Sequence, residues 1–302
     1  MEKNSISTVK DFTGEVAKEV RKILGDGFKV KYREVIKNNG IVYHALLISE
    51  EGRRIAPTIY TDVYFDDYKR GMSLDEAVNE VVKLYRSSMP SGDMDMDFFF
   101  DFSKVTDKLF FKVVNLEKNK GKLLDVPYRK LLDLAMVPLC RVNNSVLGDG
   151  VITIQKSHLD NWEISEDELW ENIGDNAKVA APLKISGLVD VLERLSGQSL
   201  DMEPLCGISV VTNTADNLGA GAVFYPGVLE EMAAERECDL YIIPSSVHET
   251  LVIPDPQLEI DICHMRDIIR EVNRTSVAEE EILSDNLYRY ERESGRLFVV
   301  KD

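Results

Sequence analysis

The sequence has no long hydrophobic run and few cysteines, and these absences exclude several classes of protein. No apolar run approaches the roughly 18 residues that span a bilayer, and residues 1–5 lack the apolar segment of a secretory signal. The cysteines are far apart and form no C-x-x-C pair, which is typical of reduced cytosolic thiols (Cys140, Cys206, Cys238 and Cys263). We therefore expect a cytoplasmic protein without a membrane partner.

Complete signatures of catalysis, cofactor binding and metal binding are also missing. The histidines are scattered without H-E-x-x-H spacing, and the chain contains no G-x-S-x-G nucleophile elbow. Gly219-Ala220-Gly221 supplies half of a dinucleotide fingerprint, but Phe224 occupies the position of its third glycine. The sequence predicts no cofactor and no metal, and it favours small residues packed in a turn or against a strand at Gly219–Gly221.

The composition is that of a globular chain that can bury a core. Of 302 residues, 44% are apolar and 29% are charged, and this length predicts about two domains. The strongest linker signal is the Ser-, Pro- and Gly-containing segment from Ser87 to Asp93. We therefore expect a small α+β domain over 1–92 and a larger acidic α/β domain over 93–302.

Negative charge is concentrated in one half of the chain. The net charge is -17 from 36 basic and 53 acidic residues, yet residues 1–120 balance at 20 of each. Residues 160–261 carry 21 acidic groups against four basic ones, Lys178, Lys184, Arg194 and Arg236. Such a field repels nucleic-acid phosphates and attracts a basic protein. Three interpretations of this segment stay open: a plain soluble surface, a docking face for a basic partner, or a DNA mimic. We expect no direct nucleic-acid binding.

Periodic patterns predict a helix, three antiparallel strands and a helix within residues 1–92. Apolar residues at spacings of three and four predict a helix over about 8–24, and alternation from Phe28 predicts a strand. Asn38-Asn39-Gly40 favours a hairpin turn into a second strand over 41–49, and a third lies near 56–61. Ser73 and Glu76 form a capping box that begins the second helix.

The patterns in residues 93–302 predict a larger mixed α/β domain. Strands are expected over 109–116, 134–142 and 151–154, and the second is predicted to be central because it is almost continuously apolar. Ser165 caps one helix, and a second covers about 186–196. Pro226 is expected in the first turn of another helix. The remaining predictions are strands over 207–212, 220–225, 239–244 and 248–253, helices over 226–237 and 259–274, and a hairpin pairing 286–291 with 296–300.

Ser246, His248 and Glu249 are the only close grouping of a serine, a histidine and an acid. In an extended chain Ser246 and His248 point to the same face, about 6–7 Å apart by strand geometry, which is too far for a direct hydrogen bond. A structural turn and strand with satisfied hydroxyls is the simpler interpretation. These three residues are nevertheless the candidate catalytic residues.

Several segments carry a resemblance to a known family over nearly the whole chain. They include Ala56-Pro57-Thr58-Ile59-Tyr60, Ser73-Leu74-Asp75-Glu76, Val126-Pro127-Tyr128-Arg129, Tyr225-Pro226-Gly227-Val228 and, above all, Pro244 to Glu249. The chain resembles an uncharacterised family of unknown function from Clostridia-type gut bacteria, often encoded near mobile elements. The C-terminal third is also similar, faintly, to the YtpQ-like family. The resemblance implies a context and no activity.

Two hypotheses about function follow. The first is a non-enzymatic binding or accessory protein that uses its acidic domain as a contact surface for a basic protein. The alternative is a hydrolase or transferase with its site around Ser246, His248 and Glu249. A hydrogen bond from the His248 ring to a serine or cysteine nucleophile would favour the second hypothesis.

Overall fold

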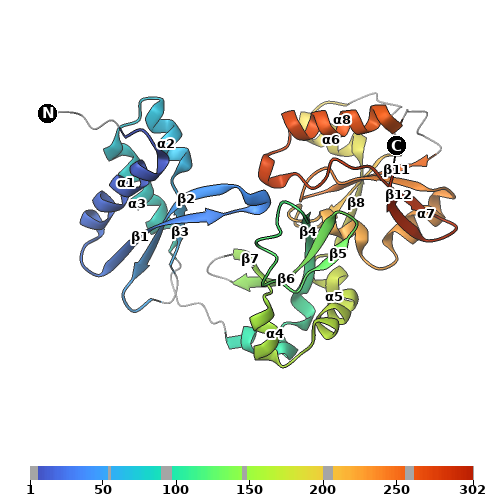
Figure 1. Ribbon diagram of the computed structural model, residues 1–302, viewed down its shortest axis with the longest axis horizontal. Helices are drawn as coiled ribbons and strands as arrows, with labels where there is room; N and C mark the ends of the chain where they lie inside the picture. The colour runs from blue at the N-terminus through green and yellow to red at the C-terminus, as the bar shows by residue number, and fades with distance from the viewer. Residues whose placement is uncertain are drawn as a thin grey trace. The chain divides into compact units, whose positions relative to one another are not determined.

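The chain folds into two compact units, each of which combines helices with antiparallel strands. The computed structural model describes residues 6–53, 56–89, 97–144, 148–199, 207–255 and 262–301. The smaller unit comprises residues 1–96 and 143–148, and the larger unit comprises residues 97–142 and 149–302 (Figure 1). The α+β fold class is confirmed. The domain boundary predicted between residues 92 and 93 lies outside the described residues.

The smaller unit begins with the predicted helix, three strands and helix. The strand order is β1-β2-β3, with both pairs antiparallel. The predicted hairpin turn is confirmed, because Asn39 and Gly40 take positive φ angles of 58° and 77°. The capping box of Ser73 and Glu76 is also confirmed. Its elements are α1 (Val9–Leu24), β1 (Phe28–Ile36), β2 (Val42–Glu50), β3 (Thr58–Tyr60), the unpredicted α2 (Asp62–Lys69) and α3 (Leu74–Ser88).

The helices of the smaller unit cover one face of its sheet. Phe12 and Val16 of α1 and Val81 of α3 are fully buried against Leu46 and Ile48 of β2. Successive side chains of a strand point to opposite faces, so Phe28 and Val30 contact this core while Lys29 and Lys31 lie on the other face. The helices therefore leave one side of the sheet without a covering layer of their own unit.

The larger unit contains two antiparallel sheets. The first has the order β4-β6-β5, with β7 also paired to β6, so the central position predicted for 134–142 is confirmed. The second has the order β13-β12-β10-β11-β9-β8. The strands are β4 (Leu109–Asn115), β5 (Arg129–Leu131), β6 (Leu134–Asn144), β7 (Gly148–Thr153), β8 (Leu183–Gly187), β9 (Ser209–Asn213), β10 (Leu240–Ile243), β11 (Thr250–Pro254), β12 (Tyr288–Glu291) and β13 (Arg296–Val299).

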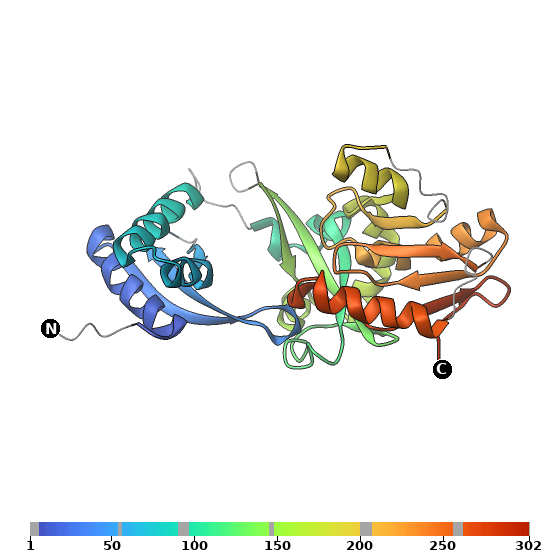
Figure 2. The same ribbon diagram turned by 90° about the horizontal axis from the view of Figure 1, so that it is seen from above.

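Helices α6 and α8 flank one face of the six-stranded sheet, and Figure 2 shows strands of the sheet between them. Met265 and Ile269 of α8 pack on Tyr241 and Ile253, whose side chains share that face. None of the described helices is long and apolar enough to cross a membrane. The helices of this unit are α4 (Lys156–Trp162), α5 (Glu166–Ala180), α6 (Leu188–Ser196), α7 (Val228–Arg236) and α8 (Ile262–Thr275).

Two local predictions in the larger unit are wrong. Residues 220–225 form no strand but a short 3-10 helix, η6 (Ala220–Phe224), which is buried on every side and therefore has an apolar sequence like that of a strand. A Cβ atom at Gly221 would lie 3.0 Å from the Phe111 ring, so η6 packs directly on β4. Pro226 lies outside the first turn of its helix, because α7 begins at Val228 after Gly227.

One carboxylate joins the two sheets of the larger unit. Asp133 lies in the β5–β6 turn and accepts hydrogen bonds from the Tyr288 hydroxyl at 2.6 Å, from Ser284 Oγ at 2.6 Å and from Asn286 Nδ2 at 3.0 Å. Burial, and then the neighbouring Asp133 carboxylate, raise the pKa of the Tyr288 phenol, so its hydroxyl keeps the proton that it donates. The C-terminal segment is thereby tied to the four-stranded sheet.

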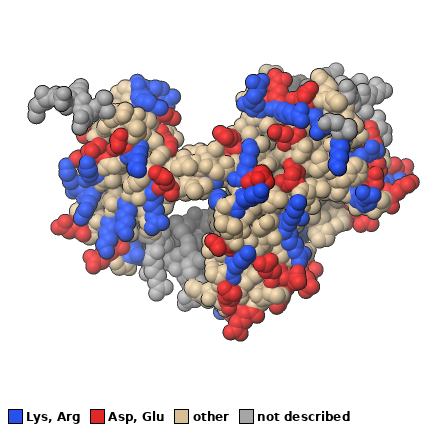
Figure 3. All heavy atoms as spheres, viewed as in Figure 1, with Lys and Arg blue, Asp and Glu red and all other residues tan. Residues whose placement is uncertain are grey.

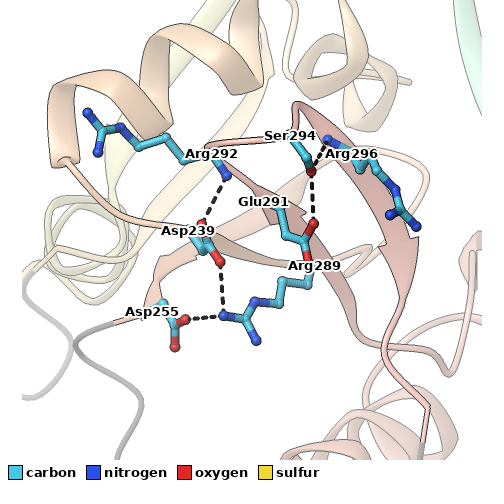
Figure 4. Close-up of polar contacts among 7 residues, drawn as sticks. All are labelled: Asp239, Asp255, Arg289, Glu291, Arg292, Ser294 and Arg296. Atoms are coloured by element: carbon cyan, nitrogen blue, oxygen red, sulfur yellow. Dashed lines mark hydrogen bonds and ion pairs between the residues drawn. The ribbon is translucent and has the colours of Figure 1, made fainter.

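A second charged cluster holds the other end of the six-stranded sheet. Arg289 of β12 donates from Nη2 to Asp239 at 2.9 Å and to Asp255 at 2.7 Å, as Figure 4 shows. Asp239 also accepts from the backbone N–H of Arg292 at 2.9 Å. The guanidinium lies 5.4 Å from the centre of the Tyr241 ring. These contacts join the ends of β10, β11 and β12.

We expect Asp133→Ala to lower the free energy of unfolding by about 3 kcal/mol or more. The substitution leaves buried donors on Ser284 and Tyr288 without their charged acceptor. Asp133→Asn keeps one acceptor oxygen and should cost less. Urea denaturation measures both variants beside Asp125→Ala, an exposed aspartate. Equal midpoints for Asp133→Ala and Asp125→Ala would show that the network does not hold the unit together.

In the native protein, exposed cysteines should be alkylated faster than buried ones. Cys140 is fully buried, and this burial raises the pKa of its thiol to about 12, whereas Cys263 is exposed. Since the thiolate is the reactive form, iodoacetamide at pH 8 should modify Cys263 first and Cys140 only after denaturation. Mass spectrometry of timed digests gives the rates. Modification of native Cys140 as fast as Cys263 would contradict the packing of β6.

Candidate functional site

The candidate catalytic residues lie in the loop between β10 and β11, residues 244–249. The strand predicted over 248–253 begins only at Thr250, so Ser246 and His248 do not share a strand face. The loop is closed by a hydrogen bond from the backbone N–H of Ser246 to the Glu249 carbonyl at 3.3 Å. The three residues are therefore close together, but in a tight turn.

The Ser246 hydroxyl is used within this turn. Its Oγ donates to Glu249 Oε1 at 2.9 Å and accepts from the backbone N–H of His248 at 3.0 Å. Ser246 is only 6% exposed. A catalytic serine needs an accessible oxygen and a neighbouring base. Here the oxygen is buried and its proton is held by a carboxylate, as in a structural turn.

The imidazole ring of His248 points to other partners. The backbone N–H of Leu218 donates to Nδ1 at 3.2 Å, so the neutral ring carries its proton on Nε2. Nε2 lies 3.2 Å from Glu281 Oε1, and Glu281 also accepts the backbone N–H of Val247 at 2.9 Å. Both ring nitrogens are thus occupied, and neither bonds to Ser246. The structure brings His248 to Glu281, which the sequence analysis did not single out.

Close packing around Gly219 fixes the position of the loop. The His248 carbonyl accepts the Gly219 N–H at 3.1 Å and the Thr212 hydroxyl at 2.7 Å. A Cβ atom at Gly219 would collide with Thr212 Oγ1 and with the Asn213 nitrogen. Gly219 is therefore needed for a close approach of backbone to backbone. The Gly219-Ala220-Gly221 segment is packed in a turn. This confirms the prediction of small packed residues and not of a dinucleotide site.

A cavity of about 540 Å³ opens beside the loop, between α6 and the edge of the six-stranded sheet. Val210 of β9 and Leu251 of β11 form part of its apolar wall. Glu249 lines the cavity, so one candidate residue faces a space large enough for a small ligand. Lys184 and Arg194 also line it. These are two of the four basic residues of 160–261, and their scarcity was the signal in the sequence that could have marked this place.

The charges of the cavity are partly compensated. Lys184 Nζ lies 2.8 Å and 2.7 Å from the two carboxylate oxygens of Asp216. Arg194 has no ion-pair partner among the residues that the structure describes. Within that part of the chain, no group of histidines, cysteines and acids could hold a metal ion. The arrangement suits binding of an amphipathic molecule better than nucleophilic attack.

Comparison with known proteins gives a family without an activity. Residues 9–292 match the model of a family described as "Family of unknown function (DUF5688)". No curated protein and no solved structure matches the chain. The match agrees with the expected uncharacterised family and assigns no role to Ser246, His248 or Glu249.

We expect Ser246→Ala to lower the free energy of unfolding by about 1–2 kcal/mol, because two hydrogen bonds of a buried hydroxyl are lost. Ser245→Ala is the matched control, since the neighbouring Ser245 is only half-buried. Thermal and urea unfolding measure both variants. A Ser246→Ala protein as stable as Ser245→Ala would mean that this hydroxyl does not hold the loop.

Proposed function

The chain belongs to a family of unknown function, and we propose that it is a non-enzymatic binding or accessory protein whose larger unit contacts a basic partner. The proposal rests on one observation, an exposed group of carboxylates of which only one has an ion pair to a described residue. We call this group the acidic surface. It consists of seven exposed side chains on α4, on α5 and between them: Asp160, Glu163, Glu166, Asp167, Glu168, Glu171 and Asp175. In Figure 3, acidic side chains gather over these two helices.

Several acids elsewhere in the described part of the chain pair with a cation three residues away. Glu15 pairs with Lys18 at 2.7 Å, and Glu117 pairs with Lys120 at 2.6 Å. The same spacing recurs in Glu19–Lys22, Asp66–Lys69, Asp67–Arg70, Glu80–Lys83 and Asp267–Arg270. On the acidic surface, only Asp167 has an ion pair to a described residue, with Arg129 at 3.1 Å. Its negative field is therefore not cancelled locally.

Helix capping explains part of this surface. Glu166, Asp167 and Glu168 lie in the first turn of α5, where carboxylates interact favourably with the helix dipole. Glu171 and Asp175 lie beyond that turn, and Glu163 precedes the helix. These three carboxylates repel their neighbours, and none of them has an ion pair to a described residue. A basic partner would remove that repulsion.

The β10–β11 loop supports binding over catalysis. The buried Ser246 hydroxyl and the occupied ring of His248 leave no nucleophile–base pair there. The hydrolase or transferase alternative is tested with a fluorophosphonate probe, and we expect no labelling of Ser246. Labelling that disappears in both Ser246→Ala and His248→Ala proteins would favour the enzyme instead.

The proposal includes what the family resemblance implies about the source of the protein. We expect the partner in the cytoplasm of a Clostridia-type gut bacterium, and we expect the gene to lie near a mobile element. The similarity of the C-terminal third to the YtpQ-like family adds no activity. A partner that binds DNA and is displaced by it would make the acidic surface a DNA mimic. Any other basic protein would make it a docking face.

We expect a stoichiometric basic partner to be captured from such a host at about 50 mM salt and lost near 500 mM, since screening shortens the range of exposed charges. Glu163→Gln/Glu171→Gln/Asp175→Asn should weaken the complex at least tenfold. Quantitative mass spectrometry of tagged pull-downs measures both effects.

The matched control removes three charges from another helix of the same unit. Glu230→Gln/Glu231→Gln/Glu235→Gln changes exposed residues of α7 and should leave capture unchanged. Equal loss in both triple variants would show a response to net charge alone. Capture that is insensitive to salt and to both variants would refute the acidic surface as the contact.

A further inference from the structure

The face of the smaller sheet that is turned away from α1 and α3 has a character opposite to the acidic surface. The register places Lys29, Lys31 and Arg33 of β1 on this side, across from Ser49, Leu47 and Ala45 of β2. Tyr60 of β3 is paired with Ala45 and so lies on the same side, as does Tyr43 of β2. No strand position on this side carries an acid. We call it the basic face.

Three cations of the basic face have no ion pair to a described residue. Lys29, Lys31 and Arg33 are exposed, and none has an ion pair to a described residue. On α1, at the opposite side of the sheet, Lys18 and Lys22 are each neutralised by a glutamate three residues earlier. Figure 3 shows Lys and Arg side chains over α1 and β1 of this unit. The three cations of β1 are therefore not neutralised by a described residue, and the basic face keeps its positive field.

Aromatic rings lie beside these cations. The rings of Tyr43 and Tyr60 meet edge to face, with centroids 5.6 Å apart. Lys37, which follows β1, lies 4.3 Å from the centre of the Tyr60 ring. Both tyrosines are only partly buried. A row of cations next to partly exposed tyrosine rings offers both contacts that an unpaired nucleotide uses, phosphate neutralisation and base stacking.

We propose that the basic face binds single-stranded nucleic acid. Alternate residues of a strand repeat every ~6.6 Å, a spacing comparable to that of successive phosphates in an extended single strand. Lys29, Lys31 and Arg33 contact the phosphates, and the bases stack toward Tyr43 and Tyr60. A duplex presents its bases only at their edges, so the tyrosines select for unpaired strands.

The proposal changes one expectation from the sequence. Direct nucleic-acid binding was excluded on the charge of residues 160–261, which belong to the larger unit. Residues 1–120 balance at 20 acidic and 20 basic groups, and the ion pairs of α1 leave part of the positive charge free on the other layer. The net charge of the chain therefore does not describe this face.

Fluorescence anisotropy of the full chain with labelled 15-nucleotide single strands, one DNA and one RNA of the same sequence, tests the proposal. We expect saturable binding that weakens with salt, with a slope of roughly −2 in log K against log salt for three phosphate contacts. Lys29→Gln/Lys31→Gln/Arg33→Gln should weaken binding at least tenfold. Tyr60→Leu, which keeps an apolar side chain without a ring face, should weaken it about tenfold. A difference between the two strands tells which nucleic acid is bound.

Matched controls separate the face from net charge and from folding. Lys18→Gln/Arg21→Gln/Lys22→Gln removes the same charge from α1 and should bind as the unchanged protein does. The triple variant of the acidic surface should also retain binding, so this test stands apart from that of the proposed function. Circular dichroism and thermal unfolding confirm that each variant is folded.

Three outcomes would overturn the proposal. Absence of binding at 50 mM salt would leave the β1 cations as protection of an edge strand against pairing with other sheets. Equal loss in the β1 and α1 variants would show a response to net charge. Equal affinity for poly-glutamate, with no effect of Tyr60→Leu, would identify the face as a site for an acidic protein.

Discussion

The hydrogen-bonded carboxylate of Asp133 is the contact on which the larger unit depends. Its two oxygens receive the hydroxyls of Ser284 and Tyr288 and the amide of Asn286, so a turn of the four-stranded sheet is joined to the chain that enters β12. More than 150 residues separate these partners. A buried donor without its acceptor costs more free energy than an average hydrogen bond returns, so the two sheets form as one unit.

The β10–β11 loop depends on that union. On one side it is held by Thr212 of β9 and by Gly219, which follows that strand. On the other side it is held by Glu281, just before Ser284. The Ser246 hydroxyl and both ring nitrogens of His248 thereby have hydrogen-bond partners within the larger unit. Beside the loop lies the cavity that α6 lines, with Glu249 at its wall.

Charge compensation divides the molecule more clearly than net charge does. Several acids and cations are arranged in pairs three residues apart, a pattern that cancels the field at short range. The acidic surface of α4 and α5 and the basic face of the smaller sheet depart from it in opposite directions. These two surfaces, one on each unit, are the basis of the two contacts that we propose, with a basic protein and with a nucleic-acid strand.

The sequence by itself determined the elements whose signals are local: the α1 periodicity, the hairpin turn at Asn39 and Gly40, the capping box at Ser73, and hence the α+β class. Tertiary structure decided the rest, because burial and partner choice depend on residues far apart in the chain. An apolar run at 220–224 became a 3-10 turn only through burial against β4 and β9. The role of Ser246 likewise followed from partners that spacing along the chain does not reveal, since a hydroxyl beside a histidine is equally compatible with catalysis and with a structural turn.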